Sequence, residues 1–305
     1  MLKDDLNKES VCPSFLGEEL SSEESDSRNA LFHVIPAPLE LTVSYGSGTR
    51  NGPKAILIAS EQLERWDGNS EPCRAGIFTQ EAIDCAEMNS AQQSLRARGA
   101  EAVRSGHIPV TLGGEHSITY GVVRGIMDEV DEPIGIIQID AHADLRTAYQ
   151  GHPHSHASVM QLLAEEGCRI ASFGVRAFCE EEAEARVKYE VLHWDAETLV
   201  MNNINEVVLP EEFPKLVYIS FDLDGLDPSV ISATGTPVPG GLGFYQALSL
   251  IKSAMRGRRC VGLDVMELAP IKGLPASDFA AALITYRLMG IALEHSYVQP
   301  RLLID

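Results

Sequence analysis

The sequence is poor in basic residues and has no long apolar run. It contains 24 Lys and Arg against 44 Asp and Glu, which gives a formal net charge of −20. Nucleic acids and anionic membranes are bound through positive charge, so this balance argues against both as partners. No stretch of about 18 apolar residues is present, and a membrane-spanning helix is therefore not expected. The acidity is compatible with a small cationic substrate.

The cysteines form no recognisable pair. There are six, widely scattered and without a CxxC spacing: Cys12, Cys73, Cys85, Cys168, Cys179 and Cys260. In a chain of 305 residues this indicates reduced thiols rather than a disulfide framework or a zinc knuckle. The first residues, Met1–Asp5, lack the basic and apolar regions of a secretory signal. We therefore expect a cytoplasmic protein.

The pattern of elements predicts one α/β domain after a polar N-terminal segment. Residues 1–28 are acidic with few apolar anchors, so we expect a flexible segment there and a single domain over residues 29–305. Strand-like runs then alternate with helical patterns of about ten residues or more. This alternation is typical of a doubly wound, mostly parallel sheet with helices on both faces. The strands are expected at residues 30–35, 107–112, 134–140, 169–175, 216–224 and 260–266.

The most informative stretch is an apolar strand that ends in three possible metal ligands. The run Ile136–Ile139 predicts a buried strand, and Asp140, His142 and Asp144 follow at alternating positions. In an extended backbone these three side chains point to the same side. Two carboxylates and an imidazole that close together would be costly without a cation between them. The spacing therefore predicts a divalent metal site.

Three further candidates stand at the ends of other predicted strands: His116, the pair Asp222 and Asp224, and Glu267. Ligands of open α/β sheets bind outside the carboxyl ends of the strands, so all these residues could share one crevice. A lone Asp-x-Asp is often a turn, and a lone histidine is often structural. Together, however, the metal ligands suit a pair of divalent cations bridged by carboxylates. The lack of thiolates disfavours structural zinc, and oxygen ligands with two imidazoles suit Mn²⁺.

Three segments resemble the signature motifs of the ureohydrolases, a family that includes arginase and agmatinase. They are Gly113–Ser117, Asp140–Asp144 and Ser220–Pro228, and they occur in the family's order. The resemblance extends from about Leu31 to Leu293. It implies the three-layer α/β/α arginase-like fold, a binuclear manganese centre and a homo-oligomer, either a trimer or a hexamer. Ligand chemistry alone does not exclude Ni²⁺ or Co²⁺.

The resemblance also implies how the metal ligands are shared. Asp140 and Asp222 would bridge the two ions, with His116, Asp140, Asp144 and Asp222 on one and Asp140, His142, Asp222 and Asp224 on the other.

The implied catalytic residues are Asp144, His156 and Glu267. Glu267 matches the glutamate that binds the guanidinium group, and a carboxylate can accept a fork of N–H bonds there. Asp144 would pass a proton to the leaving amine, and His156 falls where the family places a proton-shuttling histidine. Because His152 and His154 lie close by in the sequence, the choice among the three stays open.

The substrate is expected to lack an amino-acid head. Arg146 and Cys179 stand where arginases place residues that bind the α-carboxylate and the α-amino group. The surrounding sequence is most similar to bacterial agmatinases, which implies hydrolysis of agmatine to putrescine and urea, a reaction of polyamine biosynthesis. The alternatives are 4-guanidinobutyrate, whose carboxylate could pair with Arg146, or another guanidino compound, including arginine. A polyamine deacetylase shares the fold but uses a single zinc, and a metal-binding protein without activity would not need the full residue set.

Overall fold

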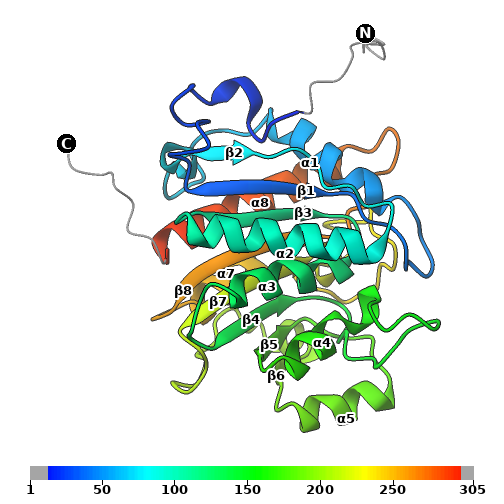
Figure 1. The fold of residues 1–305 in the computed structure, drawn as a ribbon. Coiled ribbons are helices and arrows are strands. Elements are labelled where there is room, and N and C mark those ends of the chain that lie inside the picture. Colours follow the sequence, from blue (N-terminus) through cyan, green and yellow to red (C-terminus); the bar gives the residue numbers. More distant parts are fainter. Residues whose placement is uncertain (1–12, 297–305) are drawn as a thin grey trace.

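The protein has a central parallel sheet between two layers of helices (Figure 1). The computed structural model describes residues 13–296. The eight strands are ordered β2-β1-β3-β8-β7-β4-β5-β6, and every neighbouring pair is parallel. The strands are β1 (Phe32–Ala37), β2 (Ile77–Thr79), β3 (Ile108–Gly113), β4 (Ile134–Ile139), β5 (Arg169–Phe173), β6 (Leu192–Trp194), β7 (Leu216–Asp222) and β8 (Arg259–Met266).

The helices cover both faces of this sheet. Figure 1 shows α2 and α3 in front of the sheet and α7 and α8 behind it. The apolar core is correspondingly divided into two clusters, one for each face. This arrangement confirms the expected three-layer fold. The helices are α1 (Gly52–Ser60), α2 (Met88–Arg104), α3 (Thr119–Met127), α4 (Val159–Glu165), α5 (Glu180–Lys188), α6 (Ala196–Met201), α7 (Phe244–Ala254) and α8 (Ala276–Glu294).

The central strands are buried along their whole length. Every residue of β4 and β7 is buried, which explains why both appear in the sequence as continuous apolar runs rather than as an alternation. The sheet's helical covering removes water from both faces, so polar side chains collect at the strand ends.

Residues 13–28 are anchored to the domain at a few positions, although a flexible segment was expected through residue 28. Phe15 and Leu16 are fully buried. The Leu16 N–H donates to Ser60 Oγ at 2.9 Å, and Glu24 pairs with Arg65 at 2.5 Å. These two apolar residues were not recognised as anchors because the segment around them is acidic. Residues 1–12 of the expected segment lie outside the described residues.

Among the described residues, one helix has the length and apolar composition of a membrane span. This is α8, and 61% of its apolar window is buried inside the fold. A core helix of a folded domain has the same features.

Candidate metal centre

The four predicted clusters meet at one edge of the sheet. They follow the ends of β3, β8, β7 and β4, and these strands are consecutive neighbours in the sheet. Because the strands are parallel, their carboxyl ends lie at the same edge. The structure therefore brings together side chains that are up to 151 residues apart, as in the hydrogen bond from His116 N–H to Glu267.

The first group of ligand atoms surrounds His116. Its Nδ1 lies 3.1 Å from Asp140 Oδ2, 3.0 Å from Asp144 Oδ2 and 3.3 Å from Asp222 Oδ2. All four side chains are buried. The atoms converge on one small volume, as the alternating spacing predicts.

The second group surrounds His142 and shares Asp140 with the first. His142 Nδ1 lies 3.1 Å from Asp224 Oδ2 and 3.6 Å from Asp140 Oδ1. Each oxygen of Asp140 thus faces a different group, which is the position that a bridging carboxylate needs. Asp140 Oδ1 also accepts the His142 backbone N–H at 2.7 Å, just as Asp222 Oδ1 accepts the Asp224 N–H at 2.8 Å, and the bridging roles of Asp140 and Asp222 both stay predictions.

The electrostatics of the cluster favour bound cations. Among residues 13–296, no Lys or Arg side chain forms an ion pair with these carboxylates. Burial and the Asp140 charge raise the pKa of Asp144 to about 7. Burial alone would lower the pKa of His142, but the carboxylates of Asp140 and Asp224 outweigh it and raise the value to about 12. Both pKa shifts keep a proton bound, one on Asp144 and one on His142. These protons offset the negative charge of the crowded carboxylates, which is what bound metal ions would do.

The orientation of His116 also fits a metal ligand. Its Nε2 is 2.8 Å from Ser220 Oγ, and that hydroxyl donates to Asp264 Oδ1 at 3.0 Å. With the hydroxyl hydrogen directed to Asp264, His116 Nε2 carries a hydrogen and Nδ1 keeps its lone pair. Nδ1 is buried without a hydrogen-bond partner. A metal-binding histidine typically donates its second ring N–H to a hydrogen-bond acceptor, a role that the Ser220 hydroxyl fills here.

Two of the site residues have rare backbone conformations. Asp144 has φ = 54° and Glu267 has φ = 65°, values that non-glycine residues seldom adopt. The Glu267 N–H donates to Gly114 O at 2.9 Å, and its Oε1 accepts the His116 N–H at 2.8 Å. Burial raises the pKa of Glu267 to about 8. Such strain persists where surrounding contacts enforce it, and it is concentrated at functional sites.

A cavity of about 360 Å³ opens over the ligands, and His156 is one of its lining residues. His154 instead packs against the Tyr120 ring at 5.7 Å, and His152 is exposed. Of the three histidines left open by the sequence, the structure places His156 at the cavity. The lining consists of Ser44, His142, Asp144, Arg146, Tyr149, His156, Ala157, Ala177, Phe178, Cys179, Glu182 and Thr236.

Arg146 lies in this cavity but is already partnered. Its Nε is 3.6 Å from Glu182 Oε2, and its guanidinium lies 5.0 Å from the Tyr149 ring centre. Cys179 is the N-cap residue that precedes α5, and its N–H donates to the same Glu182 carboxylate at 2.9 Å. Glu182 therefore contacts both Arg146 and Cys179, the two residues that the sequence indicated as determinants of substrate choice.

Arg176 fixes the loop that follows Asp224. Its half-buried guanidinium donates to backbone carbonyls on both sides of that loop, those of Gly174, Asp224, Gly225, Leu226 and Val238. These bonds hold the backbone of a metal-ligand candidate against the end of β5.

The sequence reasoning missed the residues that support the site. Asp264, Thr42 and Glu115 have no ligand-like spacing, and their contacts join distant segments. One signal was present for Asp264, because it is a single carboxylate inside the otherwise apolar strand β8. A buried charge of this kind needs partners.

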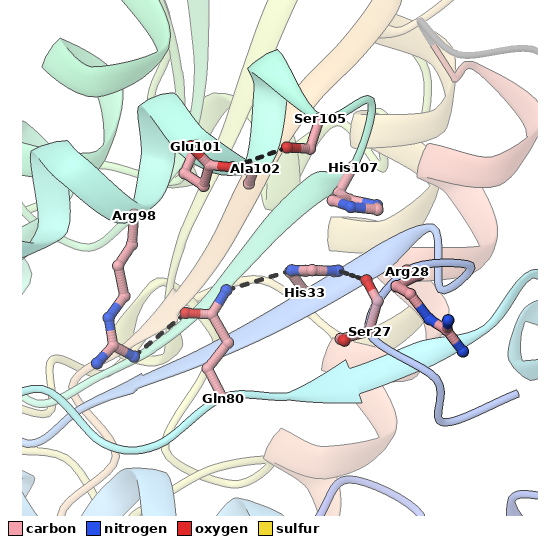
Figure 2. Close-up of a pocket in the computed structure, with 9 residues that line it drawn as sticks. All are labelled: Ser27, Arg28, His33, Gln80, Arg98, Glu101, Ala102, Ser105 and His107. Atoms are coloured by element: carbon pink, nitrogen blue, oxygen red, sulfur yellow. Dashed lines mark hydrogen bonds between the residues drawn. The ribbon is translucent and has the colours of Figure 1, made fainter. Parts of the chain in front are cut away.

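A second cavity, of about 440 Å³, lies at the opposite edge of the sheet (Figure 2). It adjoins His33 near the start of β1 and His107 just before β3, whose rings stack with centres 3.8 Å apart. His33 Nε2 is 3.0 Å from Ser27 O, and Gln80 Nε2 is 3.2 Å from His33 Nδ1. The His33 ring therefore donates from Nε2 to the Ser27 carbonyl and accepts at Nδ1 from Gln80, which is the pattern of a neutral imidazole.

Comparisons with known proteins agree with this geometry. The family model described as Arginase family matches residues 30–290. An N(1)-aminopropylagmatine ureohydrolase of Synechocystis sp. is 38% identical over 84% of this chain and 87% of that protein. A protein of the same name from Thermus thermophilus is 33% identical over 85% of this chain and 89% of that one. The crystal structure of agmatine ureohydrolase of Thermoplasma volcanium has a TM-score of 0.77 at 26% identity, covering 93% of this chain and 94% of that chain.

Proposed function

The chain belongs to the arginase family and is a ureohydrolase, a hydrolase of guanidino groups, and from this premise we propose that its substrate is a guanidinoalkylamine. The observation that carries the proposal is the pairing of Arg146 with Glu182 at 3.6 Å. Among the described residues that line the cavity, Arg146 is the one Lys or Arg. A substrate carboxylate would have to compete with Glu182 for it, which disfavours arginine and 4-guanidinobutyrate. An amine head meets no such competition.

Within this class we propose N(1)-aminopropylagmatine as the preferred substrate, with urea and the corresponding triamine as products. The names of the Synechocystis and Thermus relatives support it. Phe178 lines the cavity and is 43% exposed, so an aliphatic chain could pack along its ring toward solvent. Agmatine, which would give urea and putrescine, is the second candidate, supported by the Thermoplasma structure's title.

We propose that the centre holds two Mn²⁺ ions. The fit rests on the position of Asp140 between the two ligand groups and on the unpartnered Nδ1 of His116. When bound, the ions supply the Lewis acidity that activates water for attack on the guanidinium carbon. A homo-oligomer, trimeric or hexameric, and a cytoplasmic location stay predictions.

The chain's own residues would then orient the substrate and move protons. Glu267 uses Oε1 to accept the His116 N–H, so its Oε2 is left to accept N–H bonds from the guanidinium group. Asp144 would take a proton from the attacking water and pass it to the leaving amine. His156, at the cavity wall, would carry a proton between solvent and that amine.

The test is urea release by the purified protein with added Mn²⁺. We expect N(1)-aminopropylagmatine to give the highest kcat/KM, followed by agmatine, with little urea from arginine or 4-guanidinobutyrate. Highest activity on 4-guanidinobutyrate would contradict the amine proposal, and release of acetate from an acetylpolyamine without any urea would favour a deacetylase. Asp222→Asn should abolish urea release, whereas the same change at exposed Asp131 is the matched control.

A further inference from the structure

Glu115 is a further buried carboxylate, next in sequence to His116 of the metal centre. Glu115 follows β3 and is fully buried. Its Oε2 accepts the N–H groups of Leu41 and Thr42, both at 2.6 Å. Its Oε1 accepts the hydroxyls of Thr42 at 2.7 Å and Ser117 at 2.6 Å. Since all four partners are donors, the carboxylate acts purely as an acceptor.

The Thr42 hydroxyl connects this carboxylate to His156. Thr42 Oγ1 accepts the His156 backbone N–H at 3.1 Å and lies 3.2 Å from His156 Nδ1. A hydroxyl has one hydrogen, and here that hydrogen is directed to Glu115. The Nδ1 contact is then a hydrogen bond only if His156 Nδ1 carries a hydrogen and donates it to Thr42.

We propose that Thr42, held by Glu115, is a positioning residue that fixes His156 in the tautomer with hydrogen on Nδ1. This inference rests on the proposed role of His156 as the proton carrier. It leaves Nε2 as the nitrogen that gains and loses the proton. The Nδ1–H bond to Thr42 is the same in the neutral and the protonated ring, so the proton moves without any rotation of the side chain.

The ring plane is held as well. Tyr149 packs edge-on against His156, with ring centres 5.7 Å apart and an interplanar angle of 86°. The imidazole therefore has a partner for Nδ1 and an aromatic neighbour, and Nε2 is the nitrogen left for proton transfer. A fixed tautomer of this kind is important in catalysis by histidine, as the Asp–His pair of serine proteases illustrates.

The experiment separates positioning from a structural role by a double-mutant cycle. Thr42→Val keeps the shape of the side chain and removes the hydroxyl, whereas Thr42→Ser keeps the hydroxyl. We expect Thr42→Val to lower kcat by about 10–100-fold with KM changed by less than about twofold, and Thr42→Ser to retain near wild-type kcat. In a His156→Ala background, Thr42→Val should cause no further loss. Manganese content and thermal midpoint verify that each variant is loaded and folded.

The outcomes distinguish this inference from the proposed function. If His156→Ala keeps wild-type kcat, the proton-carrying role of His156 is wrong. If His156→Ala is impaired but Thr42→Val lowers kcat equally in both backgrounds, Thr42 does not act through His156 and the positioning proposal is overturned. Equal loss in Thr42→Val and Thr42→Ser would also overturn it, because the hydroxyl would then be irrelevant.

Discussion

Replacing Ser220 by Ala should weaken metal binding while leaving the sheet intact. Ser220 Oγ is buried between His116 Nε2 at 2.8 Å and Asp264 Oδ1 at 3.0 Å. The change leaves the His116 ring without its orienting partner. Residues in this position are typically worth 10–100-fold in metal affinity, so we expect the Mn²⁺ concentration for half-maximal activity to rise by about 10–100-fold. The unpaired buried groups should also lower the free energy of unfolding by about 1–3 kcal/mol.

The matched control is Thr119→Val. Thr119 Oγ1 also donates to Asp264, at 2.8 Å, but to Oδ2, whereas the Ser220 hydroxyl that holds the His116 ring donates to Oδ1. Chelator-treated protein is titrated with MnCl₂ while urea release is measured, and unfolding is followed in urea. Thr119→Val should lose comparable stability with an unchanged Mn²⁺ requirement. A wild-type Mn²⁺ requirement in Ser220→Ala, or the same increase in both variants, would refute the orienting role of Ser220.

Three further predictions concern the shared ligand, the loop and a distant histidine. Asp140→Asn should reduce urea release at saturating Mn²⁺ to below about 1% of wild type, because both ligand groups lose a charged oxygen. Activity above about a tenth of wild type would count against a bridging role for Asp140. Arg176→Met should lower the free energy of unfolding by about 3–5 kcal/mol in a urea titration, because several backbone carbonyls lose a charged donor. A decrease of less than about 1 kcal/mol would contradict this. Burial and the charge of His107 lower the pKa of His33 to about 4. The unfolded chain therefore binds the proton more readily, and stability should fall by at most about 3 kcal/mol as pH drops from about 6.5 toward 4. Urea midpoints at pH 7 and pH 4.5 test this, and His33→Gln should show a smaller difference.

The fold was predictable where burial on both faces produces a continuous apolar run. The strands β4 and β7 were expected for this reason. By contrast, β2 and β6 have three residues each and exist because they pair with a neighbour at a sheet edge, which a local pattern does not reveal. Likewise, α6 was not expected.

Pro36 shows a related limit of local reasoning. The first strand was expected to end at residue 35, before this proline, yet β1 continues through it to Ala37. On one side β2 pairs only with residues 32–34, so Pro36 lies beyond that ladder. A proline is tolerated in a strand where its missing N–H interrupts no ladder hydrogen bond.

For the site, the ligand positions were predictable and their support was not. Asp140, His142 and Asp144 follow from spacing along one strand end, which is a local property. The hydrogen bonds that orient His116 and His156 pass through Ser220 and Thr42, which are 104 and 114 residues away in sequence. No spacing rule connects residues at such separations, because the connection is made by the order of the strands.

That order has a consequence for how the protein is made. β8, the last of the described strands to leave the ribosome, lies between β3 and β7. Until it is in place, β1, β2 and β3 form one sheet fragment and β4 to β7 form another. His116 follows a strand of the first fragment, whereas the aspartates follow strands of the second. A nascent chain that ends before residue 259 thus has both halves of the metal centre and no means of joining them. Contacts this distant in sequence form slowly, so metal uptake should be a late event that signals a completed sheet.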